Sequence, residues 1–469
     1  MADPAPSDAL QARGAHSGEP LGPNVVAASV SAPDLLSGPG PTHHVPAYAY
    51  GAAWSPAQRA AFRFAFCLAV LLYFPFPFPL QLLPFTDPVN EWIDQRHTKA
   101  SIWLTERLFH PPPEELPEQT GSGDTLWSYV QMGANLAIAL VAAAAWTALD
   151  RRRVQYRMLA AWLGLFVRWA LFCTMAFYGF SKVFPLQMPW DAGRLVQPLG
   201  EFSPMGLVWT FMGASMPYEM LAGWAEVIGG LLLVWRRTAG IGALLLLGVV
   251  GNVAAINYCY DVPVKLYSTQ LWLTAACIAA PDARRLFRLL VLQRPTVPAP
   301  PPPPLVPWER VLRRRWLGPA LIVTLAGWQI FSDVRGALET RERFAERAAK
   351  APLVGVYQVE SFTPSPSAAP DSFLAAPAWA RISGSAFYLG ILRADGSYIT
   401  ARASAEPDGT VKLDRPRLKQ SATVRLERPD AEHVRLSGEG FEVKLKAIPT
   451  SSFMLLRGYH WVQPQPVNR

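Results

Sequence analysis

Long apolar runs separated by short basic clusters fill most of the first 331 residues. A helix of about 20 apolar residues crosses the hydrocarbon core of a bilayer. On this basis, membrane spans are predicted at residues 59–83, 126–149, 158–184, 217–235, 238–258, 264–280 and 316–331. The pattern predicts a mainly α-helical polytopic membrane protein with seven spans.

Two segments near the first span follow different patterns. Alternating prolines at Pro75, Pro77 and Pro79 remove backbone donors, so this span is predicted to end as an extended segment near the membrane surface. Residues 89–109 place apolar side chains at helical spacing among polar ones. This pattern predicts an amphipathic helix that lies in the plane of the interface.

From about residue 352 the apolar period changes from helical to alternating. Short runs such as Tyr388–Leu392 and Phe441–Leu445 are separated by turn dipeptides, including Asp395-Gly396 and Asp408-Gly409. Such a succession predicts a meander of about eight antiparallel strands. A small all-β domain, a barrel or a sandwich, is therefore expected outside the membrane.

These patterns divide the chain into five regions. They are a disordered Pro/Ala-rich tail at 1–57; two spans with the interfacial helix at 58–150; a four-helix region at 151–290; a polyproline linker, the seventh span and a charged connecting helix at 291–350; and the β domain at 351–469.

Composition and charge agree with a membrane protein. The chain has 469 residues, of which 51% are hydrophobic and only 17% are charged, whereas soluble proteins carry about 25% charged residues. The net charge of +8 is gathered in clusters beside the apolar runs, which is an orientation signal rather than a nucleic-acid signature. With the basic clusters inside, the N-terminus is predicted to be cytoplasmic and the β domain extracytoplasmic, in the inner (plasma) membrane.

Charged and polar residues within or beside predicted spans are the candidate functional residues, since they are costly in lipid. They are Arg168, Lys182, Glu219, Glu226, Asn252, Asn257, Asp261 and Lys265. Arg168 and Lys182 share one helix face, and Glu219 and Glu226 share another. Because the two spans run in opposite directions, Lys182 is predicted to meet Glu219 near the outer surface, with Arg168 and Glu226 deeper.

Two interpretations of these residues stay open. The four charges either join two helices as structural ion pairs or line a polar pocket for a quinone headgroup, a proton or a small substrate. Asp261 either caps the sixth span or forms, with Asn252, Asn257 and Lys265, the outer rim of that pocket.

The sequence gives no sign of a resident cofactor. All seven histidines lie outside the predicted spans, so a bis-histidine haem in the bundle is not expected. Nucleotide-binding, zinc-protease and serine-hydrolase motifs are absent, and the four cysteines form no C-x-x-C. No metal site is predicted, and no catalytic residue can be named.

The stretch from Arg168 to Arg285 resembles the DoxX-like family of small four-helix membrane proteins. The likeness rests on Arg168, the run Tyr178-Gly179-Phe180-Ser181-Lys182, and Glu226-Val227-Ile228-Gly229-Gly230. Residues Asn257–Leu266 and Arg457–Trp461 look similar to longer family members that carry an extra C-terminal domain.

This resemblance implies a four-helix core and a link to membrane redox complexes, including thiosulfate:quinone oxidoreductase. It makes a quinone-linked redox subunit, with quinone as a diffusible cofactor and a redox or periplasmic protein as partner, the first functional hypothesis. The alternative is a non-enzymatic assembly or scaffold protein whose β domain binds a partner or lipid.

Overall fold

The computed structural model describes residues 53–74, 87–110, 122–297, 316–364, 373–374, 377–386, 388–438, 440–458 and 462–463. The chain divides into two units, residues 1–52 and 53–469, and all described elements belong to the second. Most of the predicted N-terminal tail, the proline repeat after the first span, the polyproline linker and part of the Arg457–Trp461 motif lie outside the described residues.

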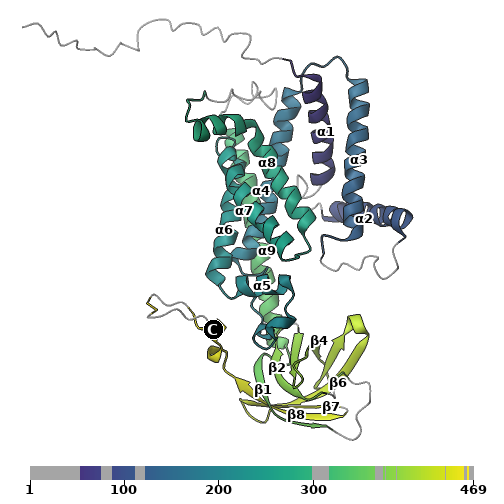
Figure 1. Ribbon diagram of the computed structural model, residues 1–469, viewed down its shortest axis with the longest axis vertical. Coiled ribbons are helices and arrows are strands. Elements are labelled where there is room, and N and C mark those ends of the chain that lie inside the picture. Colours follow the sequence, from purple (N-terminus) through teal and green to yellow (C-terminus); the bar gives the residue numbers. More distant parts are fainter. Residues whose placement is uncertain are drawn as a thin grey trace, which may run out of the picture. The chain divides into compact units, whose positions relative to one another are not determined.

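All but one of the α-helices in the described helical part were predicted from the sequence (Figure 1). Its α-helices are α1 (Pro56–Tyr73), α2 (Asp87–Phe109), α3 (Leu126–Leu149), α4 (Arg157–Val183), α5 (Pro204–Gly213), α6 (Met216–Val234), α7 (Ala239–Cys259), α8 (Lys265–Leu286) and α9 (Leu317–Lys350). Short 3₁₀ turns η4 (Ala192–Leu195) and η5 (Leu199–Glu201) connect α4 to α5, and a π-helical turn η6 (Phe287–Val291) follows α8.

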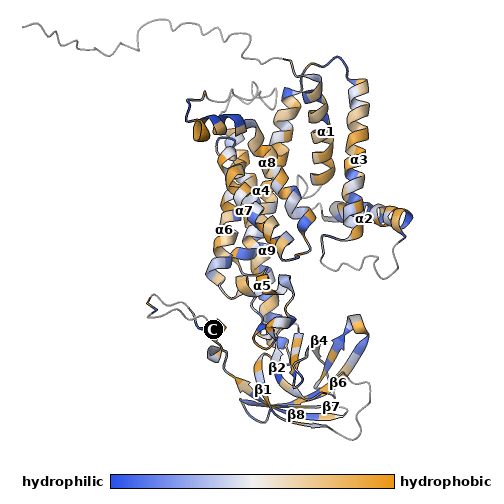
Figure 2. Ribbon diagram, in the orientation of Figure 1, coloured by the Kyte–Doolittle hydropathy of each residue, from blue (hydrophilic) through white to orange (hydrophobic). Residues whose placement is uncertain are grey.

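Five described helices are long and apolar enough to cross a membrane: α3, α4, α6, α7 and α9. Figure 2 shows that hydrophobic residues occupy much of the length of these helices. By length and hydropathy, the described helices therefore do not confirm the predicted count of seven membrane spans. The described part of the first span, α1, is only 18 residues long and carries Arg59 and Arg63, and α8 ends with Arg284 and Arg285.

Local sequence signals explain several helix boundaries. Ser55 and Gln58 form a reciprocal capping box at the start of α1, and Thr125 caps α3. Ser203 caps α5, and Pro204 stands in its first turn. Helix α5 was not predicted from the sequence, and it packs against α6 through Val208 and Met212.

The helices α4, α6, α7 and α8 form one packed group. Helix α4 contacts α6 and α8, and α7 contacts both α6 and α8. Two apolar clusters hold these contacts, one around Phe172 and Val227 and one around Leu233 and Leu246. Helix α9 lies against α4, where Ala326 joins the first cluster.

The predicted seventh span and charged connecting helix are one continuous helix. Helix α9 runs for 34 residues without interruption. Only residues 351–354 separate it from the first strand, and Leu353 is already part of the β domain's core.

The β domain is a closed antiparallel barrel, which confirms the small all-β domain predicted from the alternating pattern. Its strands follow sequence order: β1 (Gly355–Pro364), β2 (Trp379–Gly384), β3 (Tyr388–Arg393), β4 (Tyr398–Ala405), β5 (Thr410–Arg415), β6 (Gln420–Glu427), β7 (His433–Gly438) and β8 (Phe441–Ile448). Strand β1 closes the barrel, since Val356 is paired with Ser383 of β2 and with Ile448 of β8.

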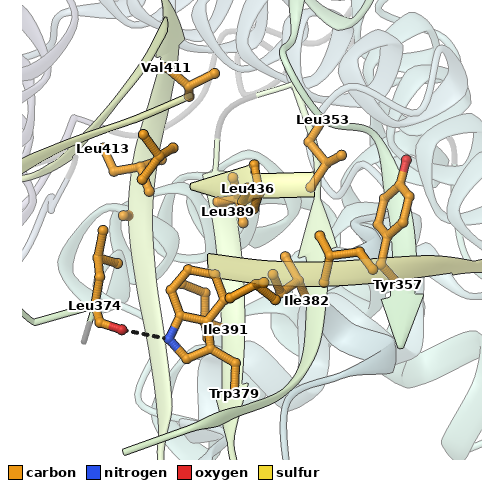
Figure 3. Close-up of a cluster of buried hydrophobic side chains, with 14 of the residues drawn as sticks. Leu353, Tyr357, Leu374, Trp379, Ile382, Leu389, Ile391, Val411, Leu413 and Leu436 are labelled. Carbon is orange, nitrogen blue, oxygen red and sulfur yellow. Dashed lines mark hydrogen bonds between the residues drawn. The ribbon is translucent and has the colours of Figure 1, made fainter. Parts of the chain in front are cut away.

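Side chains fill the inside of the barrel. Alternate residues such as Ile391, Leu413 and Leu445 point inward and are fully buried. Figure 3 shows part of this core, with the indole N–H of Trp379 donating to the carbonyl of Leu374 at 2.9 Å. The barrel is thus a packed domain, as expected for eight strands.

Candidate functional site

A buried ion pair joins α4 to α6. The Lys182 ammonium donates to both carboxylate oxygens of Glu226, with Nζ–Oε1 and Nζ–Oε2 distances of 2.9 and 2.7 Å. The two side chains are only 7% and 4% exposed. Burial of this kind lowers the local dielectric, so each charge depends strongly on its partner.

This pairing differs from the predicted one, in which Lys182 met Glu219. Side chains on a helix tilt toward its N-terminus. The helices are antiparallel, so Lys182 leans toward the level of Glu226, and Glu226 leans toward Lys182. Glu219 leans away from both, toward the start of α6. The predicted contact of Lys182 with Glu219 was wrong because it left out the direction in which side chains tilt along a helix.

Two glycines bring the backbones of α4 and α6 close together beside the ion pair. A Cβ atom at Gly223 would lie 2.6 Å from the carbonyl oxygen of Gly179 and 2.9 Å from the Cβ of Lys182. One at Gly179 would lie 2.6 Å from Val227. The two glycines therefore allow α4 and α6 to approach closely beside the Lys182–Glu226 pair.

Glu219 occupies a separate buried position. Its Oε1 accepts the backbone N–H of Met188 at 3.2 Å, in the segment that follows α4. Met188 packs with Val208 and Met212 of α5. Glu219 therefore connects the start of α6 to the α4–α5 segment rather than to Lys182.

Arg168 does not join the other three charges. It is half-buried, and its Nε donates to the carbonyl of Gly164 in its own helix at 3.0 Å. Within the described part of the chain it forms no ion pair. Fourteen residues of helix, about 21 Å, separate it from Lys182. Arg168 and Glu226 were predicted to lie deeper than the other two charges, but Glu226 pairs with Lys182 and Arg168 stays apart.

Tyr178 is a neighbour of the pair that was not among the predicted candidate residues. It stands one turn before Lys182, whose Nζ lies 3.5 Å from the Tyr178 carbonyl oxygen and 5.8 Å from the centre of its ring. The i, i+4 spacing on one helix face was the available signal. The ring of Tyr178 lies 6.3 Å from that of Tyr267 in α8.

The two asparagines of α7 differ in environment. Asn252 is exposed, whereas Asn257 is buried. The Nδ2 of Asn257 has no hydrogen-bond partner among the described residues. Its backbone carbonyl accepts the N–H of Val262 at 3.0 Å, which helps to end the helix.

The start of α8 is capped from a distant part of the chain. Both carboxylate oxygens of Asp124 accept backbone N–H groups, from Lys265 at 2.8 Å and Leu266 at 2.9 Å. The Lys265 ammonium lies 3.6 Å from Asp124 and 2.8 Å from Asp261, whose side chain is exposed. The capping role considered for Asp261 belongs to Asp124, which was not among the predicted candidate residues.

The structure thus separates the eight candidates into distinct places. Lys182 and Glu226 form one buried pair, which can exchange a proton or fix two helices. Lys265 and Asp261 form a small polar cluster at the start of α8. The described residues contain no group of three or more His, Cys, Asp or Glu arranged to hold a metal ion.

A polar cavity of about 410 Å³ adjoins the outer face of the barrel. Asp191, Arg194 and Glu201 line it from the α4–α5 segment, and Tyr388 and Tyr398 line it from β3 and β4. Burial raises the pKa of Tyr398 above its usual range. None of the eight candidate residues contributes to this cavity.

Comparison with known proteins shows a partial similarity to a bacterial protein. The chain is 36% identical over 89 residues to the uncharacterized protein YwoB of Bacillus subtilis (strain 168). The match covers 19% of this chain and 57% of that protein. No protein-family model matches the chain, and no solved structure matches it.

Proposed function

We propose that this protein is a membrane-embedded scaffold that presents its C-terminal barrel to a protein partner outside the cytoplasm. The observation that carries the proposal is the continuous helix α9. It combines a candidate membrane span with a charged second half and leads into the barrel within four residues.

The length of α9 fits this role. At about 1.5 Å per residue, 34 residues extend about 51 Å. A bilayer core takes up about 30 Å of that length. About 20 Å, or about 14 residues, therefore remains outside the core. This length falls within the charged stretch 333–350, which is suited to water.

The connection between α9 and the barrel is short, and its residues contact the barrel. Leu353 is 1% exposed within the barrel core. The guanidinium of Arg428 donates to the carbonyl of Pro352 at 2.9 Å. Because the barrel interior is filled by its own side chains, a partner would meet the outer face of the strands.

Orientation follows from the basic clusters. With α1 and α8 counted as spans, seven crossings place Arg151–Arg153 and Arg236–Arg237 on the cytoplasmic side of an inner (plasma) membrane. The barrel then lies in the extracytoplasmic space.

The test compares two membrane-inserted chains. Cells producing either the full chain or residues 1–350 are treated with a membrane-impermeant cross-linker, and the purified products are compared. The proposal expects a discrete partner with the full chain that is absent with residues 1–350. The same partner on the shorter chain, or none on either, would contradict it.

A second candidate is a quinone-linked redox subunit, and the Lys182–Glu226 pair favours it. Ionisable residues within membrane helices commonly mark proton or substrate pathways. The packed group α4, α6, α7 and α8 supports a DoxX-like core over residues 151–290. Quinone would here be a diffusible ligand rather than a resident cofactor.

Solvent extraction of the purified protein tests this candidate. A redox subunit is expected to carry quinone that falls several-fold in Glu226→Gln but not in the exposed control Glu339→Gln. Protein that binds no added quinone would exclude the candidate and leave the scaffold proposal untouched.

A further inference from the structure

A cavity of about 810 Å³ lies between α1 and α3, away from the ion pair of α4 and α6. These two helices are neighbours (Figure 1). Three arginines line part of the cavity: Arg59, Arg63 and Arg151. Apolar side chains line the rest, including several alanines, Phe64 and Leu140.

Arg63 brings a buried positive charge to this cavity. The residue is 3% exposed. Its guanidinium donates to the Tyr156 hydroxyl at 2.5 and 2.9 Å, to Thr147 Oγ1 at 2.9 Å and to the carbonyl of Asp150 at 2.7 Å. All of these acceptors are neutral, so within the described chain the charge of Arg63 has no carboxylate partner.

One donor of Arg59 has no protein partner among the described residues. Its Nη1 donates to the carbonyl of Arg153 at 2.9 Å. Its Nε is buried and has no hydrogen-bond partner in the described part of the chain. The nearby carboxylate of Asp150 accepts from the Tyr156 hydroxyl and lies 3.4 Å from Arg153 Nε. The arginines of the cavity therefore exceed the negative charge around them.

We propose that this cavity binds an anionic phospholipid. The phosphate would accept hydrogen bonds from Arg59 and Arg151, with Arg63 supplying further positive charge, and an acyl chain would lie along the alanine-lined face of α3. Basic pockets between membrane helices suit such headgroups. A free phosphate has no use for the apolar lining, and a zwitterionic headgroup would bring its own positive charge toward the arginines.

The size and place of the cavity agree with a lipid. A volume of about 810 Å³ is within the range of small-molecule sites and holds a headgroup with the upper part of a chain. The arginines stand at the end of α3 that leads into Arg151–Arg153. In the proposed orientation this end faces the cytoplasmic leaflet, but the binding chemistry does not depend on the scaffold role.

The test uses the full chain, purified in detergent and stripped of lipid. Thermal unfolding is followed by tryptophan fluorescence with added dioleoyl phosphatidylglycerol, dioleoyl phosphatidylcholine or inorganic phosphate. A ligand of the folded state raises Tm with concentration. Phosphatidylglycerol is expected to raise Tm at concentrations where the other two do not.

Three variants locate the site. Arg59→Gln/Arg151→Gln is expected to weaken phosphatidylglycerol binding about tenfold or more, since two charge-assisted contacts are lost. Ala144→Leu, which fills the apolar part and keeps all charges, should also weaken it. The control Arg284→Gln/Arg288→Gln removes two exposed arginines, one from the last turn of α8 and one from η6, and should bind as the unaltered chain does.

Several results would overturn the proposal. They are equal Tm shifts with phosphatidylcholine, an equal shift with inorganic phosphate, and equal phosphatidylglycerol affinity in the cavity variants and the control. If the double arginine variant does not fold, unchanged binding by Ala144→Leu is enough to reject the site.

Discussion

Removing one charge of the Lys182–Glu226 pair should destabilise the helical part strongly. In Glu226→Gln, an ammonium that is 7% exposed and lies 2.7 Å from its carboxylate would lose that partner. Removing one partner of a buried ion pair lowers the free energy of unfolding by about 3–5 kcal/mol. We therefore expect the free energy of unfolding to fall by about 3 kcal/mol or more.

A double-mutant cycle separates the interaction energy of Lys182 with Glu226 from the other effects of each substitution. Lys182→Met alone should be destabilising for the same reason, because it leaves Glu226 as an unpaired buried carboxylate. The double variant Lys182→Met/Glu226→Gln removes both charges and should recover most of the loss. We expect a coupling energy of at least about 2 kcal/mol for two groups in direct contact.

The assay is reversible unfolding in mixed detergent micelles with increasing sodium dodecyl sulfate, followed by tryptophan fluorescence. Glu339→Gln is the matched control, because it breaks the exposed Arg335–Glu339 pair of the same 2.7 Å length. That change should cost less than about 1 kcal/mol. If Glu226→Gln costs no more than the control, and the cycle shows no coupling, the reasoning about burial is wrong.

Three further predictions concern other parts of the fold. Gly223→Ala should lower the stability of the helical part by about 1–3 kcal/mol in the same assay, because its Cβ would meet backbone atoms of α4. Asp124→Ala should cost about 0.5–2 kcal/mol and speed hydrogen exchange at the start of α8, since it removes the cap. The barrel should lose stability as the pH falls below about 4, measured by circular dichroism of the barrel strands. Side-chain hydrogen bonds hold the pKa values of Asp395, Asp408 and Asp430 below the usual 3.8. The ionised carboxylates therefore stabilise the folded barrel at pH values above 3.8, and this stabilisation is lost as the pH falls and they become protonated.

Helices and strands in which hydrophobic residues recur at a regular spacing were predictable from the sequence. The predicted span 126–149 coincides with α3, because a threonine cap precedes an uninterrupted apolar run. The strands around Asp395-Gly396 and Asp408-Gly409 were also predicted, since both glycines adopt the positive φ that these turns require. Such signals lie within a few residues of the element they define.

Features that depend on contacts between distant residues were not predictable in the same way. Asp124 caps a helix that begins 141 residues later. The pairing of Lys182 with Glu226 depends on side-chain tilt and on the glycine crossing of α4 and α6. Helix α5 was missed because ten residues between turns give too short a pattern to distinguish from a loop.

The scaffold proposal is tested most directly by locating the barrel relative to the membrane. In a background with the four cysteines replaced, one cysteine at Ser437 in the barrel and one at Thr238 between α6 and α7 are labelled with a membrane-impermeant maleimide. We predict labelling of Ser437→Cys only in right-side-out vesicles and of Thr238→Cys only in inverted ones. Labelling of both from the same side would contradict a barrel carried across the membrane by α9.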